Sequence, residues 1–416
     1  MMKRSMTLLI ALLATAGAWA ANPPDHPITL SEALTIARAE NPTLRAVRAH
    51  TSAVQAGEVT AALRPNPLFT SSNEDFNVFN PSKFDPADTQ EYTQNVAFLI
   101  ERGGKRQARI DDAHQTTAVA ESQFQDAERQ LELQVKLAFV NYQLSSETLK
   151  LAEDNLHGYG QVIEANQVRL TAGDISRTDF DRIKIEEASF QSDVLTARTS
   201  MLQARSQLAA LLGIGDAAKL NVTGQLSPPP VQESLAQLQQ AALQRRPDYL
   251  AAQQSVHKAE ADLTLARANG ATDVSVGPEY KRNGPDNTIG VVFQLPLRVF
   301  DRNQGEKLRT SRELESSRYA EQAARLQVLS DVQQAWDAYE SALERHNLYS
   351  KDYLQRSQTV LERLTFSYQH GATSLLDYLD AIRSHRDVQL GALSADAQAL
   401  AAVHQLSYVT AMELLP

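Results

Sequence analysis

The sequence predicts a mainly helical protein with a small β part, duplicated along the chain. Two observations predict the helical part: residues 104–170 and 304–368 contain no proline, and each would form a helix roughly 100 Å long. A third observation predicts the β part, because a strand-like segment with period-two alternation precedes each long helix, most clearly over 289–297. Paired strands between helical segments make an ordinary helical bundle a poorer interpretation.

The N-terminus has the pattern of a secretion signal. Lys3 and Arg4 precede the apolar segment 6–16, and residues 18–20 match a small-residue cleavage site. We therefore expect residues 1–20 to be removed. Beyond them no apolar run approaches the roughly 20 residues of a membrane helix, so a membrane-spanning part would have to be a closed β-barrel.

The bulk composition excludes some functions. The formal net charge is −10, which argues against a nucleic-acid partner because phosphates need a basic surface. Cysteine is absent, so the chain has no disulfides and no cysteine to carry a lipid.

We expect two repeats, 21–213 and 233–416, joined by a linker at 214–232. Each repeat starts with a short helix that ends near a proline, at Pro42 and Pro247, because the residue before proline disfavours the helical conformation. Longer helices then follow, over 43–63 and 248–268.

Each repeat continues with a predicted strand pair. The first pair lies within 67–101 as strands 68–78 and 92–100, and the second lies within 273–298 as strands 274–280 and 288–297. Four strands leave exposed edges, which hydrocarbon does not tolerate, so other copies must complete a barrel. Three copies would supply about twelve strands, within the range of outer-membrane barrels.

The long helices turn back at two predicted tips, near Gly173 and Gly371, and return helices cover 176–212 and 374–414. Apolar residues recur at steps of four and three along these helices, as in the stripe that runs from Leu131 to Ile163. This spacing predicts antiparallel coiled-coil partners.

Several segments together resemble the TolC family of outer-membrane efflux factors over nearly the whole mature chain. They are the strand entry 64–67, the exits from the strand pairs at 101–106 and 296–305, and the two tip glycines. The resemblance implies a homotrimer with a twelve-stranded outer-membrane β-barrel and a helical tunnel, or α-barrel, in the periplasm. It places 214–232 in an equatorial collar.

The resemblance also implies partners and a function. The partners are a periplasmic adaptor (membrane fusion) protein, an inner-membrane RND transporter and outer-membrane lipid. The exit segments are similar to the CzcC branch of the family, which implies export of divalent cations such as cobalt, zinc and cadmium. Drug efflux and type I protein secretion remain alternatives, and a soluble periplasmic coiled-coil adaptor is a third.

The candidate site residues lie at the tips. The resemblance places Asp377, Asp380 and Tyr368 at the periplasmic entrance, where an acidic ring would favour cations. It places the tip turns at Gly173, Asp174 and Gly371 in contact with the adaptor. For Asp377 a second interpretation stays open, because Ser374 three residues earlier fits a capped helix start. The arginine of the family's tip falls here at Thr373, which puts an arginine-based lock in doubt.

The sequence contains no nucleophile motif, phosphate-binding loop or acid–base pair that indicates catalysis, so we predict no enzyme and no cofactor. No two histidines lie three or four residues apart, and no helical metal site is therefore predicted.

Overall fold

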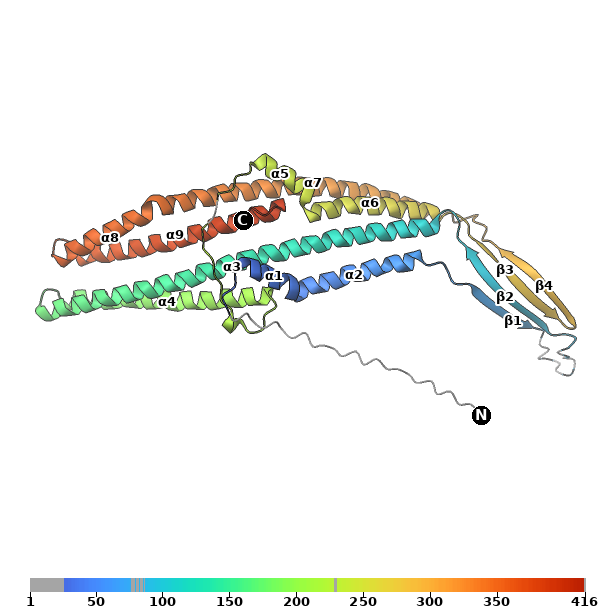
Figure 1. Cartoon of the computed structure of the whole chain (residues 1–416), viewed down its shortest axis with the longest axis horizontal. Coiled ribbons are helices and arrows are strands. Elements are labelled where there is room, and N and C mark those ends of the chain that lie inside the picture. The colour runs from blue at the N-terminus through green and yellow to red at the C-terminus, as the bar shows by residue number, and fades with distance from the viewer. Residues whose placement is uncertain are drawn as a thin grey trace. The chain divides into compact units, whose positions relative to one another are not determined.

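The computed structural model describes residues 26–75, 79, 82, 85, 87–227 and 230–414. The predicted signal sequence, 1–20, and residues 76–78 of the first predicted strand lie outside the described residues. Short helix, longer helix, two strands, long helix and return helix follow one another in this order twice along the chain (Figure 1). The mainly helical fold with a small antiparallel β part is therefore confirmed, whereas the repeat boundaries stay a prediction.

The chain forms two compact units. The described residues of unit 1 fall within Met1–Arg45, Leu131–Pro230 and Glu340–His404, and those of unit 2 fall within Ala46–Gln130, Val231–Tyr339 and Gln405–Pro416. Among the described residues, no helix is both long enough and apolar enough to cross a membrane.

Unit 2 contains one four-stranded antiparallel sheet in the order β1-β2-β3-β4 (Figure 1). Its strands are β1 Leu68–Glu74, β2 Glu91–Ile100, β3 Val274–Asn283 and β4 Asp286–Gln294. The pairing of β2 with β3 joins the two predicted strand pairs into one sheet, with β1 and β4 at its edges. Within the described chain β1 ends four residues before the predicted position 78, and β3 extends three residues past 280 into a tight turn at Gly284, whose φ is 56°.

The register gives the sheet two chemically different faces, because directly opposed residues of antiparallel strands point to the same side. Phe98 opposes Val276, which in turn opposes Phe293. Their face also carries Phe69, Val96, Ile100, Val274, Pro278, Tyr280, Ile289 and Val291, with polar residues at its hairpin end: Ser71, Asn73, Gln94, Arg282 and Asn287. The other face is mainly polar, with Thr70, Ser72, Glu91, Thr93, Asn95, Gly277, Glu279, Lys281, Thr288 and Gln294, but it also carries Leu68, Ala97, Leu99 and Val292.

The helices of unit 2 are most of α2 (Pro42–Ala62), α5 (Leu235–Arg245), α6 (Pro247–Ala268), the first part of α3 (Lys105–Ala172), most of α7 (Gln304–Leu348) and the last turns of α9 (Leu375–Thr410). Arg246, just before Pro247, is 4 % exposed. It is compensated by ion pairs to Asp248 at 2.6 Å and Asp331 at 2.9 Å, as a buried charge requires.

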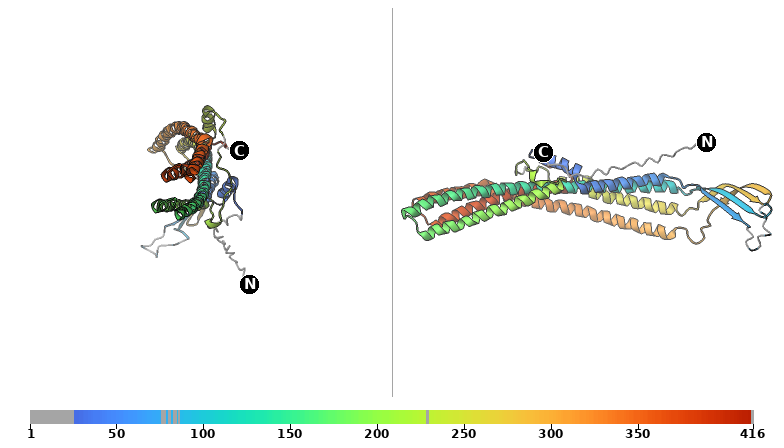
Figure 2. Two further views of the ribbon diagram at one scale, coloured as in Figure 1. Left: turned by 90° about the vertical axis from the view of Figure 1, so that its left-hand side faces the viewer. Right: turned by 90° about the horizontal axis from the view of Figure 1, so that it is seen from below.

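Unit 1 is built from helices that lie side by side in Figure 2: the second part of α3, α4 (Arg177–Leu211), α8 (Leu354–Gln369) and most of α9. A short helix, α1 (Leu30–Glu40), begins at a Thr29–Glu32 capping box. Tyr159, Ile183, Phe190 and Leu379 form a buried cluster. Tyr159 is a position of the predicted stripe from Leu131 to Ile163, so that stripe does face a core here.

The second long helix runs through 304–369, as predicted over 304–368, but one of its turns is not α-helical. A π-helical turn, Tyr349–Tyr353, separates α7 from α8. On the facing helix α9, a Cβ added to Gly391 would lie 2.7 Å from the ring of Tyr349. The wider turn therefore coincides with a close contact between the ring of Tyr349 and the backbone of α9. Because Gly391 lies some forty positions away, the local sequence around Tyr349 does not indicate this contact.

Candidate functional site

Both predicted tips are glycine turns within unit 1. Gly173 has φ 84° and Gly371 has φ 71°, the left-handed conformation that favours glycine at the end of a helix. Asp174 is exposed, and its amide donates to the carbonyl of Arg169 at 2.8 Å. The helix-ending interpretation accounts for both glycines, and their contact with an adaptor stays a prediction.

The predicted aspartates begin α9. The amide of Asp377 donates to Ser374 Oγ at 3.2 Å, and that hydroxyl donates to Asp377 Oδ2 at 2.7 Å. The hydrogen bond from Ser374 holds the pKa of Asp377 below its usual value. Asp377 thus makes the capping contacts, as Asp179 does with Ser176 at the start of α4.

Asp380 lies one turn further along α9, beyond the cap. Both Asp377 and Asp380 are exposed, and their three-residue spacing puts them on one face of the helix. The capping of Asp377 leaves its carboxylate ionised and in solvent, so capping and an electrostatic role at an entrance are compatible in one residue. The entrance role itself stays a prediction for both.

Tyr368 ties the two hairpins of unit 1 together. Its ring is 6 % exposed, and its hydroxyl donates to Asn166 Oδ1 on α3 at 2.8 Å. It stacks on Tyr378 of α9 with ring centroids 4.7 Å apart and an interplanar angle of 10°. The Arg169 guanidinium carbon lies 4.7 Å from the centroid of the Tyr368 ring. Burial raises the pKa of Tyr368, so the hydroxyl stays protonated and remains a donor.

Sequence reasoning found Tyr368 but missed its three partners. A signal was present in the duplication: Asn166 and Arg169 precede Gly173 by seven and four residues, and Tyr368 precedes Gly371 by three. If the two tips lie level, these side chains lie at similar heights. An arginine does reach the tyrosine, but it comes from the first hairpin rather than from position 373.

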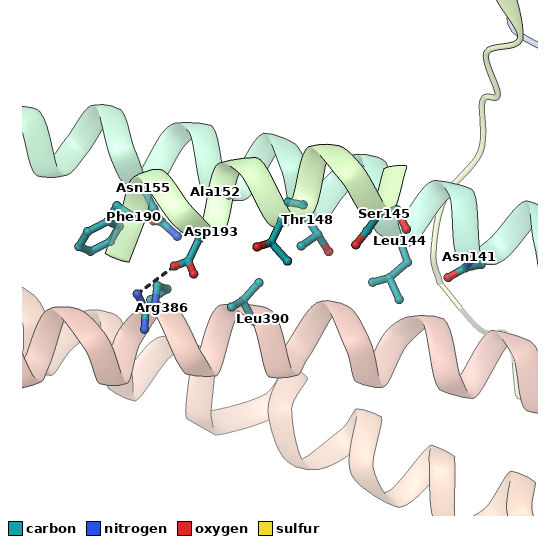
Figure 3. Close-up of a pocket in the computed structure, with 13 residues that line it drawn as sticks. Asn141, Leu144, Ser145, Thr148, Ala152, Asn155, Phe190, Asp193, Arg386 and Leu390 are labelled. Carbon is teal, nitrogen blue, oxygen red and sulfur yellow. Dashed lines mark hydrogen bonds and ion pairs between the residues drawn. The ribbon is translucent and has the colours of Figure 1, made fainter. Parts of the chain in front are cut away.

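Further from the tips, two arginines of α9 connect to α4. Arg383 Nε donates to Glu186 Oε1 at 2.7 Å, and Arg386 pairs with Asp193 at 3.0 Å. The second pair closes one end of a cavity of about 390 Å³ between α3, α4 and α9 (Figure 3). Its lining combines polar and apolar side chains. The polar ones include Asn141, Ser145, Thr148, Asn155, Thr196 and Ser200, and the apolar ones are Leu144, Ala152, Phe190, Ala197 and Leu390.

No group of three or more His, Cys, Asp or Glu side chains is arranged to hold a metal ion in the part of the chain that the structure describes. What unit 1 offers is a set of ties between two helical hairpins: one neutral, at Tyr368, and two ionic, at Arg383 and Arg386. Such contacts hold the two hairpins together while they are formed, and the hairpins can separate when they break.

Comparison with known proteins agrees with this architecture. The family model "Outer membrane efflux protein" matches residues 33–214 and 238–411. The cobalt-zinc-cadmium resistance protein CzcC of Cupriavidus metallidurans is 26 % identical over 387 residues, 91 % of this chain and 90 % of CzcC. The cation efflux system protein CusC of Escherichia coli is 24 % identical over 323 residues, 73 % of this chain and 68 % of CusC.

Solved structures share the fold. A CusC crystal structure superposes with a TM-score of 0.78 at 20 % identity and covers 92 % of both chains. The open state of the Neisseria gonorrhoeae MtrE outer-membrane channel gives a TM-score of 0.75 at 20 % identity, over 92 % of this chain and 89 % of that one. Since the family model covers most of its length on both sides of the linker, the chain belongs to the outer membrane efflux protein family.

Proposed function

We propose that this protein is the outer-membrane duct of a tripartite efflux system that exports divalent heavy-metal cations, and that it conducts passively rather than catalysing a reaction. The observation that carries the proposal is the two-faced sheet of unit 2. Ile289, Val291 and Phe293 on one face are 85, 63 and 69 % exposed, although they are large and apolar. The opposite face is mainly polar, although Leu99 and Val292 also lie on it, and this alternation is that of strands between lipid and a water-filled lumen.

The edges of the sheet support a trimer. β1 and β4 each pair on one side only, and unpaired backbone groups are not tolerated in hydrocarbon. Joining β1 of one copy to β4 of the next closes the sheet, and a homotrimer reaches about twelve strands. The helical hairpins of three copies would then form the α-barrel that continues the duct into the periplasm.

The tips support the proposed partners. Gly173, Asp174 and Gly371 lie in exposed turns at the ends of the two hairpins, where a periplasmic adaptor can reach them. An inner-membrane RND transporter would supply the energy through that adaptor. Tyr368 would hold the entrance closed through Asn166, and three copies of Asp377 and Asp380 would give the entrance an acidic ring that favours cations.

The relatives support the metal cargo. The names of CzcC and CusC describe cobalt-zinc-cadmium resistance and cation efflux. A nickel and cobalt resistance protein, CnrC of Cupriavidus metallidurans, is also 25 % identical over 299 residues. A duct need not bind its cargo tightly, so the proposal does not require a fixed metal site.

Two measurements test the proposal. Crosslinking of isolated outer membranes is expected to trap a trimer, and recovery as a soluble monomer would refute the duct. Growth of a deletion strain on zinc, cobalt and cadmium is expected to fall, with complementation by the wild-type chain. Unchanged metal tolerance with increased antibiotic sensitivity would instead indicate drug efflux.

A further inference from the structure

Four chain segments of unit 2 meet where the sheet joins the helices, and we call them the junction layer: 62–64, 101–109, 266–273 and 298–307. Hydrogen bonds fix them at one level. The amide of Arg102 donates to Asp273 Oδ1 at 2.9 Å, and Arg106 Nε donates to the carbonyl of Ala62 at 2.8 Å. Asn303 Nδ2 donates to the carbonyl of Ala266 at 2.7 Å.

The junction layer is basic in an acidic protein. The whole chain has 40 basic and 50 acidic side chains, yet these four segments contain nine Lys and Arg and only four Asp and Glu. Several of the nine have structural partners: Lys105 pairs with Asp273 at 2.6 Å, Arg109 pairs with Glu101, and Arg106 binds the end of α2.

Four arginines of the junction layer are left over. They are exposed, and within the described residues none of them forms an ion pair: Arg64, Arg102, Arg267 and Arg302. They come from the end of α2, the start of α3, the end of α6 and the start of α7. Their guanidinium groups have no internal charge to neutralise, so the fold by itself does not explain them.

Exposed apolar side chains directly precede Arg302 in the chain. The apolar face of β4 continues with the same alternation beyond its end at Gln294, through Leu297 and Val299, which are 80 and 61 % exposed. Phe300 follows and is 92 % exposed. An exposed apolar stripe that ends in an aromatic ring among arginines is the composition of a membrane–water interface, with acyl chains on one side and phosphates on the other.

We propose that the junction layer binds the phosphate groups of anionic glycerophospholipids in the periplasmic leaflet of the outer membrane, through Arg102 and Arg302 with Arg64 beside them. The inference rests on the proposed function, since it requires the sheet to span the membrane. Leu297, Val299 and Phe300 contact the acyl region next to the bound headgroup. Arginine suits this role because its planar guanidinium donates two parallel hydrogen bonds to a phosphate.

The test compares two double variants with the same change in charge. Arg102→Gln with Arg302→Gln removes the proposed phosphate contacts, and Arg325→Gln with Arg363→Gln removes two exposed arginines on α7 and α8. Each channel is purified, stripped of lipid and titrated with phosphatidylglycerol or phosphatidylcholine in neutral detergent. We expect the wild type to prefer phosphatidylglycerol, and we expect the first variant to bind it on the order of tenfold more weakly, with phosphatidylcholine and the control variant unaffected.

Several outcomes would overturn the inference. The first is equal binding of the two lipids by the wild type, and the second is an equal loss of phosphatidylglycerol affinity in both variants. The third is displacement of the lipid by millimolar inorganic phosphate, which would indicate a phosphate site instead. A wild type missing from the outer membrane would refute the duct itself. A wild type present there without a headgroup preference would refute this inference alone.

Discussion

The hydroxyl of Tyr368 on α8 donates to Asn166 on α3 at 2.8 Å, across 202 positions of sequence. This bond joins the first helical hairpin of unit 1 to the second near their tips. Stacking on Tyr378 fixes the plane of the ring. The hydrogen bond between Tyr368 and Asn166 therefore has a fixed geometry. Because both side chains are neutral, salt does not screen it.

Tyr368→Phe removes the hydroxyl and keeps the ring stack. A buried hydrogen bond of this kind contributes about 1 kcal/mol, and Asn166 is left without its donor. We expect a channel that opens more readily, measured as a higher mean conductance in planar bilayers. The matched control is Tyr319→Phe, at a ring that is 64 % exposed on α7. Equal conductance in the two variants would show that the tie does not restrain the entrance.

Asp377→Ala combined with Asp380→Ala tests the acidic ring. Three copies would lose six negative charges at the proposed entrance, so block by divalent or trivalent cations is expected to weaken and the conductance to rise. Block is measured by cation titration of single channels. Glu340→Ala with Glu344→Ala, an exposed pair on α7, controls for the change in net charge. Unaltered block would leave Asp377 with its capping role only.

Local sequence signals predicted most element boundaries. Ser374 predicted the start of α9 and Pro247 the end of α5, because capping and proline effects act within one turn. Period-two alternation likewise placed Ile289, Val291 and Phe293 of β4 on one face. These signals depend on neighbours a few positions apart, so they can be recognised in a single sequence.

Long-range contacts could not be predicted in the same way. The pairing of β2 with β3 joins segments about 180 residues apart, and the partners of Tyr368 lie on another hairpin. The π-helical turn coincides with a close approach of the Tyr349 ring to Gly391 of α9. Each of these features involves packing between distant segments. Local propensity and periodicity contain no information about such packing.

His404 predicts a pH dependence of stability. Its ring on α9 is 1 % exposed, and neither ring nitrogen has a hydrogen-bond partner. Burial, with a smaller effect from Lys136, lowers the pKa of His404 to about 4. The unfolded chain binds this proton near pH 6.5, so the folded state loses stability as the pH falls from 6.5 towards 4, by at most about 3 kcal/mol per chain.

His404→Leu is expected to remove that part of the pH dependence, because leucine cannot bind a proton. Thermal unfolding between pH 7.5 and pH 4.5 measures it: the Tm of the variant should fall less on acidification than the Tm of the wild type. His50→Leu, at an exposed position of α2, is the control and should leave the wild-type slope unchanged. Parallel slopes in all three proteins would contradict the assignment to His404.

Two identical substitutions with opposite expected signs test the packing at the π-helical turn. Gly391→Ala places a methyl group 2.7 Å from the Tyr349 ring, so the ring or the turn must shift, at a cost of about 1–3 kcal/mol. Gly158→Ala, within α3, meets no atom within 4 Å, and alanine favours a helix over glycine by about 1 kcal/mol. Thermal unfolding should therefore show a lower Tm for the first variant and a higher one for the second. Equal shifts would mean that the close contact of Tyr349 with Gly391 does not limit the stability of unit 1.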